Sequence, residues 1–362
     1  MAAIGFGKYP PPIAAMGRSY KNSDFNNNNW ERTMRAFVTG GTGFLGANLI
    51  EQLLADGWQV IAMHRHGSDT KRLQQQGVEL AEASFADIDS LRNAMPENLD
   101  AVFHLAANTN LWRGGNVQQW RDNVEGSANI ARVAREKNAG RLIATSSIAV
   151  YGYQSGRIDE RSPKLADDPR HGYLYTKKRA EEAVRAEIER GLDAVFLNPC
   201  AIVGKYDTTS WAQTFFLMEK DQLPGVPPGK GSFCYAGSVA RAHIDAFRKG
   251  RCGENYILAG RDASFLEFFG RIAALLGKPA PKRAMPAFVI HTLGWLSDLW
   301  SIASGREPLI TPEKAAMVTK RVVASSDKAV RELGYQSDTD LDTMLRECYD
   351  WLVEQKLLKA SA

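Results

Sequence analysis

Two tyrosines and two lysines lie within six positions of the segment HGYLYTKKRAEE, residues 171–182. A tyrosine of pKa ~10 is a poor base near neutral pH, but a nearby cation favours its phenolate and lowers that pKa. Lys177 follows Tyr173 by four residues, so the two side chains would share one helix face. Tyr175 has Lys178 three residues on and an arginine four residues on. Helix geometry alone therefore allows either tyrosine to act as a tuned acid or base.

A hydride donor near this segment would give such a tyrosine its task, and a phosphate-binding turn occurs early in the chain. Gly40, Gly43 and Gly46 have the spacing G-x-x-G-x-x-G. Such glycines permit a positive φ, let a pyrophosphate approach the backbone, and let helix and strand pack closely. The phosphate would then meet the amino end of the following helix. Three expected elements frame the turn and predict dinucleotide binding: a strand over 36–39, a helix over 48–55 and a strand over 58–63.

The end of the second strand indicates which dinucleotide is bound. NAD enzymes of this type carry an acid here for the ribose hydroxyls, whereas this sequence has His64 and Arg65. A 2′-phosphate attracts cations, so NADP(H) is favoured, and NAD(H) stays open. Arg65 is the expected contact, while Lys71 and Arg72 are either further contacts or solvated residues of the next helix.

The later segments predict an α/β protein with a Rossmann-type doubly wound parallel sheet and a smaller C-terminal substrate lobe. Ligands of such a sheet lie at the carboxyl ends of the strands. Further strands are expected over 79–85, 101–106, 141–147 and 193–199, alternating with helices over 87–95, 117–138 and 173–190.

Composition and length narrow the class of protein. The 362 residues carry a net charge of +4 with acids and bases interspersed, which does not favour a nucleic-acid partner. Four scattered cysteines predict reduced thiols, a cytoplasmic protein and no metal site. Residues 1–33 are expected to be a disordered extension, with Met34 as an alternative start. The nucleotide-binding domain is expected over 34–203 and the substrate lobe mainly over 204–362, with segments around 236–258 returning to the first domain.

The apolar segment AFVIHTLGWLSDLWSIASG, residues 287–305, needs a separate interpretation because it contains His291 and Asp298. A membrane span requires about 20 nearly uncharged residues, so no span is expected. An amphipathic helix packed on the body or roofing a pocket is favoured over a helix lying on a membrane surface.

Six ordered motifs together resemble those of the extended short-chain dehydrogenases/reductases, in the NAD-dependent epimerase/dehydratase superfamily. The similarity is greatest to the dihydroflavonol-4-reductase-like and 3β-hydroxysteroid-dehydrogenase-like branch, and it covers residues 35 to 355. The motifs are TGGTGFLG (39–46), DAVFHLAA (100–107), NVEGSANIARVA (123–134), TSSIAVYG (145–152), YLYTK (173–177) and NPCAIVG (198–204).

The resemblance implies a Ser–Tyr–Lys catalytic group. Its pattern Y-x-x-[ST]-K fits Tyr173 and Lys177 and does not fit a start at Tyr175. The matching serine is Ser147, four residues before a tyrosine in S-x-x-V-Y-G, and Asn123 matches a supporting asparagine. In this family the tyrosine exchanges a proton with the substrate oxygen, the serine hydrogen-bonds that oxygen, and the lysine binds ribose and lowers the pKa of the tyrosine.

The expected cofactor contacts combine the glycine turn with the strand ends. Ser84, beside Phe85, replaces an acid that often contacts the adenine in the family. An adenine contact at Ser84 would therefore be made through the backbone or the hydroxyl. Many members of the family dimerise through a four-helix bundle that includes the tyrosine helix, and this branch also contains monomers. The resemblance therefore implies a possible homodimer. The contacts are Gly40, Thr42, Gly43, Phe44, Leu45, Gly46, His64, Arg65, Ser84, Phe85, Leu105, Ala106, Ala107, Ser146, Tyr173, Lys177, Asn198, Pro199, Ala201 and Ile202.

The expected reaction is reversible NADP(H)-dependent reduction of a ketone or aldehyde on an apolar or aromatic small molecule. Sugar-nucleotide enzymes of the family usually carry an arginine for the diphosphate, and Gly231 takes its place here. A sugar-nucleotide epimerase and a non-catalytic NADP(H)-binding regulator remain alternatives. The apolar side chains expected either to line the substrate site or to form the core of the lobe are Trp211, Phe215, Phe216, Leu217, Phe233, Trp295 and Trp300.

Overall fold

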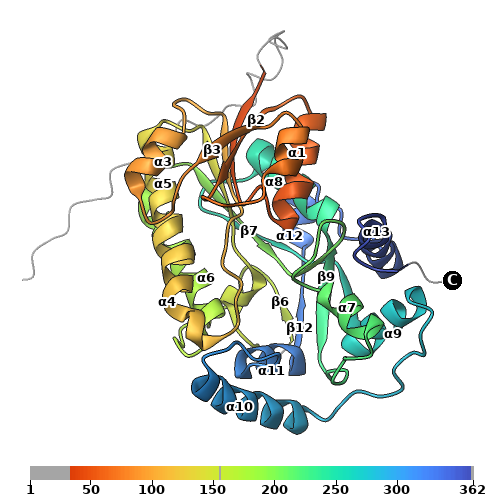
Figure 1. Cartoon of the computed structure of the whole chain (residues 1–362). Coiled ribbons are helices and arrows are strands. Elements are labelled where there is room, and N and C mark those ends of the chain that lie inside the picture. The colour runs from red at the N-terminus through yellow and green to blue at the C-terminus, as the bar shows by residue number, and fades with distance from the viewer. Residues whose placement is uncertain (1–32, 155, 360–362) are drawn as a thin grey trace, which may run out of the picture. The chain divides into compact units, whose positions relative to one another are not determined.

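The computed structural model describes residues 33–154 and 156–359, so the expected extension over 1–33 lies outside the described residues except for Thr33. Figure 1 shows the elements in chain order. The strands are β1 (Arg35–Thr39), β2 (Gln59–His64), β3 (Glu79–Glu82), β4 (Ala101–His104), β5 (Arg141–Thr145), β6 (Arg157–Ile158), β7 (Ala194–Pro199), β8 (Ala201–Val203), β9 (Lys230–Tyr235), β10 (Asn255–Leu258), β11 (Arg261–Ser264) and β12 (Arg321–Ala324). The α-helices are α1 (Phe44–Ala55), α2 (Lys71–Gln75), α3 (Ile88–Ala94), α4 (Asn116–Trp120), α5 (Gly126–Glu136), α6 (Gly172–Ile188), α7 (Gln213–Glu219), α8 (Ala236–Lys249), α9 (Phe265–Leu275), α10 (Ala287–Ser304), α11 (Pro312–Thr319), α12 (Asp327–Leu333) and α13 (Leu341–Glu354).

The larger sheet has seven strands in the order β10-β7-β5-β4-β1-β2-β3, and every neighbouring pair is parallel. Thr39, at the end of β1, lies opposite Met63 of β2 and His104 of β4. The carboxyl ends of the central strands therefore meet at one edge of the sheet, where ligands of doubly wound folds bind. The predicted Rossmann-type α/β fold is confirmed.

Helices cover both faces of this sheet because alternate strand residues point to opposite sides. Ala36 and Val38 of β1 pack in the cluster that includes α1, α8 and α12, whereas Phe37 packs in the cluster that includes α3, α5 and α6. Figure 1 shows these two sets of helices on opposite sides of the strands. Both faces are thus buried, which is typical of parallel sheets.

Several element bounds differ from the sequence prediction: α1 begins at Phe44 instead of residue 48, and β4 and β5 end two residues early. Two further differences have a visible structural cause. The third strand ends at Glu82 instead of residue 85, because the chain turns where the Ser84 hydroxyl accepts the N–H of Ala86. The helix expected over 117–138 is α4, a π-helical segment at Arg121–Glu125, and α5. A π-helical segment locally widens the helix and often lies at a functional site.

A second sheet is formed mainly by the C-terminal half and by β6, with the order β11-β9-β12-β6 and with β8 paired to β9. Its apolar core joins α7, α9 and α13 and includes the rings of Phe233 and Phe268, stacked at 4.3 Å between centroids. Between these segments the chain returns to the larger sheet, where α8 packs against α1 and β10 pairs with β7.

Helices α10 and α11 pack against one another beyond the second sheet (Figure 1). Gly305 ends α10 in the left-handed region at φ 66°, and Thr311 caps α11 by accepting the N–H of Lys314. Across the described part of the chain, no helix combines the length and the apolar character needed to cross a bilayer.

Candidate active site

A large cavity of about 1280 Å³ extends from the glycine turn after β1 to residues of the C-terminal half of the chain. Ser84, Asn123 and Asn198 do not line it. The predicted residues that do line it are Gly40, Thr42, Gly43, Phe44, Leu45, Gly46, His64, Arg65, Phe85, Leu105, Ala106, Ala107, Ser146, Ser147, Tyr173, Lys177, Pro199, Ala201 and Ile202. Its volume exceeds the 300–1,000 Å³ typical of small-molecule pockets, so it has room for a dinucleotide and a substrate together.

Two glycines of the turn lie where a side chain would collide with backbone. A Cβ on Gly46 would lie 2.1 Å from the carbonyl oxygen of Gly40. Gly40 itself has φ +74°, and a Cβ there would lie 2.7 Å from the backbone nitrogen of Ala106. The turn therefore depends on glycine at both positions to bring β1, α1 and the loop after β4 together.

The geometry of this turn fits a dinucleotide phosphate. Helix α1 begins at the cavity, has Gly43 as its N-cap, and carries no side-chain cap and no acid in its first turn. Its amide groups and dipole therefore face the cavity with no carboxylate to compete with a phosphate. Deeper in the cavity, the buried Ser146 hydroxyl has no hydrogen-bond partner among the described residues. A bound group could satisfy this hydroxyl.

The two basic residues after β2 both line the cavity. His64 is half-buried and its Nδ1 lies 3.2 Å from the carbonyl oxygen of Arg65, while the Arg65 side chain is exposed. Arg72 instead supports the turn, because its guanidinium donates to the carbonyl oxygens of Gly41 and Thr42 at 3.3 and 3.4 Å. Arg65 is therefore the better placed cation for a 2′-phosphate.

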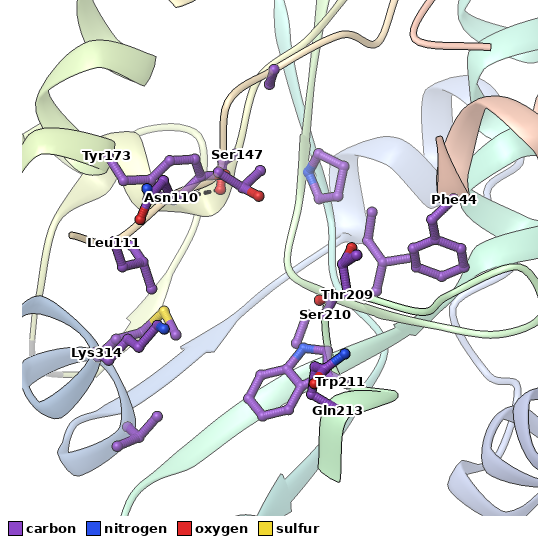
Figure 2. Close-up of a pocket in the computed structure, with 18 of the residues that line it drawn as sticks. Phe44, Asn110, Leu111, Ser147, Tyr173, Thr209, Ser210, Trp211, Gln213 and Lys314 are labelled. Atoms are coloured by element: carbon purple, nitrogen blue, oxygen red, sulfur yellow. Dashed lines mark hydrogen bonds between the residues drawn. The ribbon is translucent and has the colours of Figure 1, made fainter. Parts of the chain in front are cut away.

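Ser147 and Tyr173 are hydrogen-bonded to one another through their side chains. Figure 2 shows the two side chains together on one side of the pocket, with Trp211 and Phe44 across from them. Ser147 follows β5, and its hydroxyl also accepts the N–H of Ala149 at 3.2 Å. Tyr173 lies in the first turn of α6. The two hydroxyls thus reach the cavity from different elements and can contact one substrate oxygen.

The pKa of Tyr173 differs from the sequence-based expectation that Lys177 lowers it. Burial raises this pKa, the Glu313 carboxylate raises it further, and the hydrogen bond with Ser147 acts in the opposite direction. Burial has the largest effect, because an ionised phenolate would lose its hydration. Tyr173 is therefore held as a neutral phenol at neutral pH.

Glu313, which the sequence analysis did not single out, caps the amino end of α6 from 140 residues away. Its carboxylate accepts the backbone N–H of Tyr173 at 3.1 Å and is also hydrogen-bonded by the N–H groups of Gly172 and Leu174. Burial raises the pKa of Glu313 to about 7 in spite of these bonds. Nothing in the local pattern of α11 indicates that its glutamate reaches another helix.

Lys177 is buried one helical turn after Tyr173 and lines the same cavity. Its Nζ donates to the carbonyl oxygen of Thr145 at 2.8 Å. Burial lowers the pKa of Lys177 to about 8, and the charge of Glu181 opposes the change. Lys177 is thus a desolvated cation that still carries its charge at neutral pH.

Asn123 lies in the π-helical segment, behind the cavity wall. Its side chain donates to the carbonyl oxygen of Asn108 at 2.9 Å and to the hydroxyl of Thr176 at 3.1 Å, and it accepts the N–H of Asn108 at 2.7 Å. It therefore ties α6 to the loop after β4. Because Asn108 itself lines the cavity, Asn123 acts through another residue.

Asn198 and Ser84 were expected at the cofactor, and the structure places both away from the cavity. Asn198 is fully buried, donating to the carbonyl oxygen of Ser147 at 3.1 Å and to the carboxylate of Glu181 at 2.8 Å. It thereby fixes the strand end that carries Ser147. Ser84 is exposed at the turn after β3, whereas its neighbour Phe85 lines the cavity.

A buried polar chain supports the loop that contains Leu105 and Ala106. Thr39 Oγ1 lies 2.8 Å from His104 Nδ1 and also accepts the N–H of Ala106, while His104 Nε2 lies 3.0 Å from the Ser127 hydroxyl. Burial and the charge of Lys177 lower the pKa of His104 to about 3, so the ring is neutral. The sequence signal that could have indicated this series of hydrogen bonds is a histidine inside an otherwise apolar strand.

Part of the cavity wall is largely apolar, and the side chains expected either to line it or to form the core of the lobe divide between the wall, the core and the surface. Trp211 and Leu217 line it, whereas Phe215 and Phe233 are buried in the core of the second sheet. Phe216 packs against the same core, and Trp295 and Trp300 are exposed and do not line the cavity. Other apolar residues complete the wall, including Ile290, Leu293, Met317 and Val318, together with the polar side chains of Gln213, Lys230 and Lys314.

Comparison with known proteins places this geometry in one family. The model of the NAD dependent epimerase/dehydratase family matches residues 36–259, which is more than half of the chain. The match runs from the second residue of β1 to the residue after β10 and so includes the larger sheet except for Arg35.

Similar proteins extend over nearly the whole described chain. A Synechocystis sp. protein named provisionally as a dihydroflavonol 4-reductase is 28% identical over 89% of this chain and 96% of its own. The 2-alkyl-3-oxoalkanoate reductase of Stenotrophomonas maltophilia is 29% identical over 86% of this chain and 98% of its own. The crystal structure of gox2253 superposes with a TM-score of 0.78 at 28% identity, covering 90% of this chain and 99% of that one.

Proposed function

The chain belongs to the NAD dependent epimerase/dehydratase family and is an NAD(P)-dependent dehydrogenase/reductase, and from this premise we propose that it reduces a ketone or aldehyde on an apolar small molecule with NADPH. The reverse reaction is oxidation of a secondary or primary alcohol. Tyr173 is the proton donor and acceptor, Ser147 binds the substrate oxygen, and Lys177 supplies a buried positive charge.

The observation that supports this proposal is the hydrogen-bonded pair of Ser147 and Tyr173 in the cavity. The same cavity is lined by the turn of Gly40 and Gly46 and by a set of apolar residues. A carbonyl group bound at the pair would lie next to both hydroxyls. Two donors that converge on one oxygen stabilise the negative charge that develops there during reduction.

Reduction adds a hydride to the carbonyl carbon and a proton to the carbonyl oxygen. The bound nicotinamide would supply the hydride. Tyr173 gives up the phenolic proton, and burial suits it to this role because the raised pKa keeps it protonated. The hydrogen bond from Ser147 favours the phenolate that remains. Oxidation of the alcohol uses the same groups in reverse and needs the phenolate at the start.

The proposed preference for NADP(H) depends on Arg65 and His64. Both residues line the cavity next to the turn, and no acid occurs among the five residues from Met63 to Gly67. A guanidinium can bind a 2′-phosphate through two parallel hydrogen bonds. An exposed side chain such as Arg65 can reach the phosphate without an initial desolvation cost.

The apolar part of the cavity wall supports the proposed substrate class. Its wall combines Trp211 with aliphatic residues from α10 and α11. The 2-alkyl-3-oxoalkanoate reductase, to which this chain is similar, is named for a ketone that bears alkyl chains. A long apolar substrate would replace water along this wall and gain affinity from the buried area.

A sugar-nucleotide epimerase is the second candidate, and two cations in the cavity favour it. Lys230 and Lys314 line the cavity, and either could contact a diphosphate. Lys314 is already paired with Glu307 at 3.3 Å, and Gly231 occupies the position expected for the diphosphate-binding arginine. A non-catalytic NADP(H)-binding regulator would not need Ser147, Tyr173 and Lys177 in one cavity.

The proposal is tested with Tyr173→Phe, which removes one hydroxyl and preserves the ring. NADPH oxidation with a panel of aromatic, steroidal and alkyl ketones should fall by about 10²-fold or more, as expected for loss of a general acid. NADPH binding, measured by fluorescence, should change less than about twofold because the phenol is not expected to hold the phosphates. Unchanged turnover in Tyr173→Phe would exclude this residue as the acid.

The same panel should include UDP- and GDP-sugars, scored by epimerised product. Turnover of a sugar nucleotide without ketone reduction would select the epimerase. NADPH binding with neither activity would select the regulator.

A further inference from the structure

Helix α10 has two apolar sides, of which only one faces the cavity. Ile290 and Leu293 line the cavity from this helix. On the other side six large apolar residues are exposed, and we name them the outer face of α10. They are Phe288, Trp295, Leu296, Leu299, Trp300 and Ile302, with exposures of 71% for Phe288, 58% for Trp295 and 53% for Trp300.

The outer face is a stripe along the helix and not a set of isolated residues, although the exposed polar residues His291 and Thr292 lie between Phe288 and Trp295. Phe288, Trp295, Leu299 and Ile302 are separated by seven, four and three positions, which puts them on one side of an α-helix. Leu296 and Trp300 are four positions apart and flank the stripe. Contiguous exposed apolar surface of this kind marks an interaction site on a protein that is otherwise well packed.

Charges around the outer face have one predominant sign. Asp298 is the sole acid within α10, and it is turned inward, buried, and paired with Arg113 at 3.1 Å. Lys282 and Arg283 are exposed just before the helix, and Arg306 is exposed just after it. The next acid, Glu307, pairs with Lys314. The stripe is therefore bordered at both ends by cations.

The cavity reaches the surface beside this face. Leu309, five residues after α10, lines the cavity and is 59% exposed, and Ile310 lines it as well. At the other end of α10, Met285 lines the cavity just before the helix begins. Both ends of α10 thus border the cavity, and Figure 1 shows α10 at the end of the molecule beside α11.

We propose that the outer face of α10 docks on the surface of an anionic lipid bilayer, with the helix lying in the interface and the cavity opening toward the lipid. Trp and Phe side chains partition into the boundary between headgroups and acyl chains, and flanking Lys and Arg contact anionic headgroups. The helix lies on the bilayer and does not cross it. As a consequence that depends on the proposed function, an apolar ketone would enter the cavity from the bilayer.

A second copy of this chain is a less suitable occupant of the outer face. A twofold contact through α10 would bring the cations of one copy, Lys282, Arg283 and Arg306, near those of the other. Like charges at the border of an interface oppose association. An anionic surface has the complementary sign.

Vesicle flotation with the full chain tests the docking surface without any activity measurement. Vesicles of phosphatidylcholine with one third phosphatidylglycerol should carry several-fold more protein than vesicles of phosphatidylcholine alone, and added salt should reduce the difference. The double variant Trp295→Ser/Trp300→Ser should reduce the bound protein by roughly tenfold. Lys282→Gln/Arg283→Gln should weaken the dependence on phosphatidylglycerol.

A matched control introduces two serines at exposed apolar residues outside α10. Val117 and Leu165 are exposed apolar residues outside α10, and Val117→Ser/Leu165→Ser should bind vesicles like the parent. Sedimentation velocity on the parent and on Trp295→Ser/Trp300→Ser tests whether a second copy of this chain binds the outer face of α10 instead. A dimer that the tryptophan substitutions dissociate, together with no binding to either vesicle, would overturn the proposal.

The docking surface and the proposed function can fail separately. Vesicle binding through Trp295 and Trp300 without any ketone reduction would preserve the surface and reject the function. If both are correct, the tryptophan variant should reduce a water-soluble ketone at the parental rate and a vesicle-dissolved ketone several-fold more slowly. Equal loss for both ketones would reject the route through the bilayer.

Discussion

The carboxylate of Glu313 accepts a hydrogen bond from the backbone N–H of Tyr173 at 3.1 Å. This bond joins α11, near the end of the chain, to the first turn of the helix that carries the proposed acid. The same carboxylate raises the pKa of the Tyr173 phenol. Glu313 therefore has two separable effects, one on the stability of the fold and one on the protonation of Tyr173.

The stability of the protein should fall as the pH rises through the titration of Glu313. The pKa of this carboxyl is about 7 in the folded chain against an ordinary value of 4.5 for a glutamate. Between these values the folded chain holds a proton that the unfolded chain has lost, so ionisation costs the folded state up to about 3 kcal/mol above pH 7. Glu313→Gln removes this cost and keeps an acceptor for the N–H groups. At pH 8 it should be about 1–3 kcal/mol more stable than the parent in urea unfolding, and at pH 4.5 about equally stable.

The informative quantity is how the stability difference between Glu313→Gln and the parent changes with pH. A stability difference that stays constant between pH 4.5 and pH 8 would show that Glu313 does not titrate in this window. Thr311→Ala, which removes only the cap of α11, should lower stability by about 1 kcal/mol at every pH and serves as the control.

Glu313→Gln should also move the pH profile of alcohol oxidation to lower pH. The negative charge of Glu313 disfavours the phenolate of Tyr173, and oxidation needs that phenolate as the base. Loss of the charge lowers the pKa of Tyr173, so the oxidation rate should reach half of its maximum at a lower pH. Initial rates of NADP⁺ reduction measure the shift, and they must extend to about pH 11.5 because the pKa of Tyr173 is raised above its ordinary value. A lower rate with an unmoved midpoint would assign Glu313 a purely structural role.

Arg65→Ala should reduce the discrimination between the two dinucleotides. Loss of a guanidinium opposite the 2′-phosphate should weaken NADPH binding by roughly tenfold and leave NADH binding within about twofold. Lys71→Ala is the control, since Lys71 does not line the cavity. Titrations of both cofactors by fluorescence give the two ratios. Equal affinities of the parent for NADPH and NADH would contradict the proposed preference for NADP(H).

Gly46→Ala should damage the turn between β1 and α1. Its Cβ would lie 2.1 Å from the carbonyl oxygen of Gly40, and backbone must move to relieve the collision. We expect a loss of about 2–4 kcal/mol in the free energy of unfolding and weaker cofactor binding. Gly270→Ala is the matched control, because a Cβ there meets nothing within 4 Å inside α9. That substitution should stabilise the protein by up to about 1 kcal/mol.

Much of the fold could be predicted because its signals are local. The glycine spacing after β1 and the alternation of strands with helices predicted the parallel sheet, and the observed strand order confirms it. Strand ends were less accurate, as β3 shows, because a side chain at the turn decides where pairing stops. The break of the helix over 117–138 was not predictable, since a π-helical segment has no simple sequence period.

The direction in which large apolar side chains face was the main error at the site. Trp295 and Trp300 share a helix with Ile290 and Leu293, and the apolar pattern of 287–305 surrounds much of that helix. Which side meets the cavity depends on how α10 packs on α11, a tertiary contact that the apolar pattern of α10 does not encode. The sequence pattern therefore indicated an apolar helix but not its orientation.

The two tyrosines of HGYLYTKKRAEE illustrate how the information in local sequence spacing differs from that in the tertiary structure. Sequence spacing was enough to predict that Tyr173 and Lys177 share one face of a helix, because four residues make about one turn. Tertiary structure decided their surroundings: Tyr173 meets Ser147 and Glu313 in the cavity, whereas Tyr175 stacks on Trp120 at 5.9 Å. It also decided the protonation of these groups, since the pKa values of Tyr173, Lys177 and Glu313 are shifted chiefly by burial. Burial is produced by segments far apart in the chain, so local spacing can name the reacting side chains but cannot determine their charge.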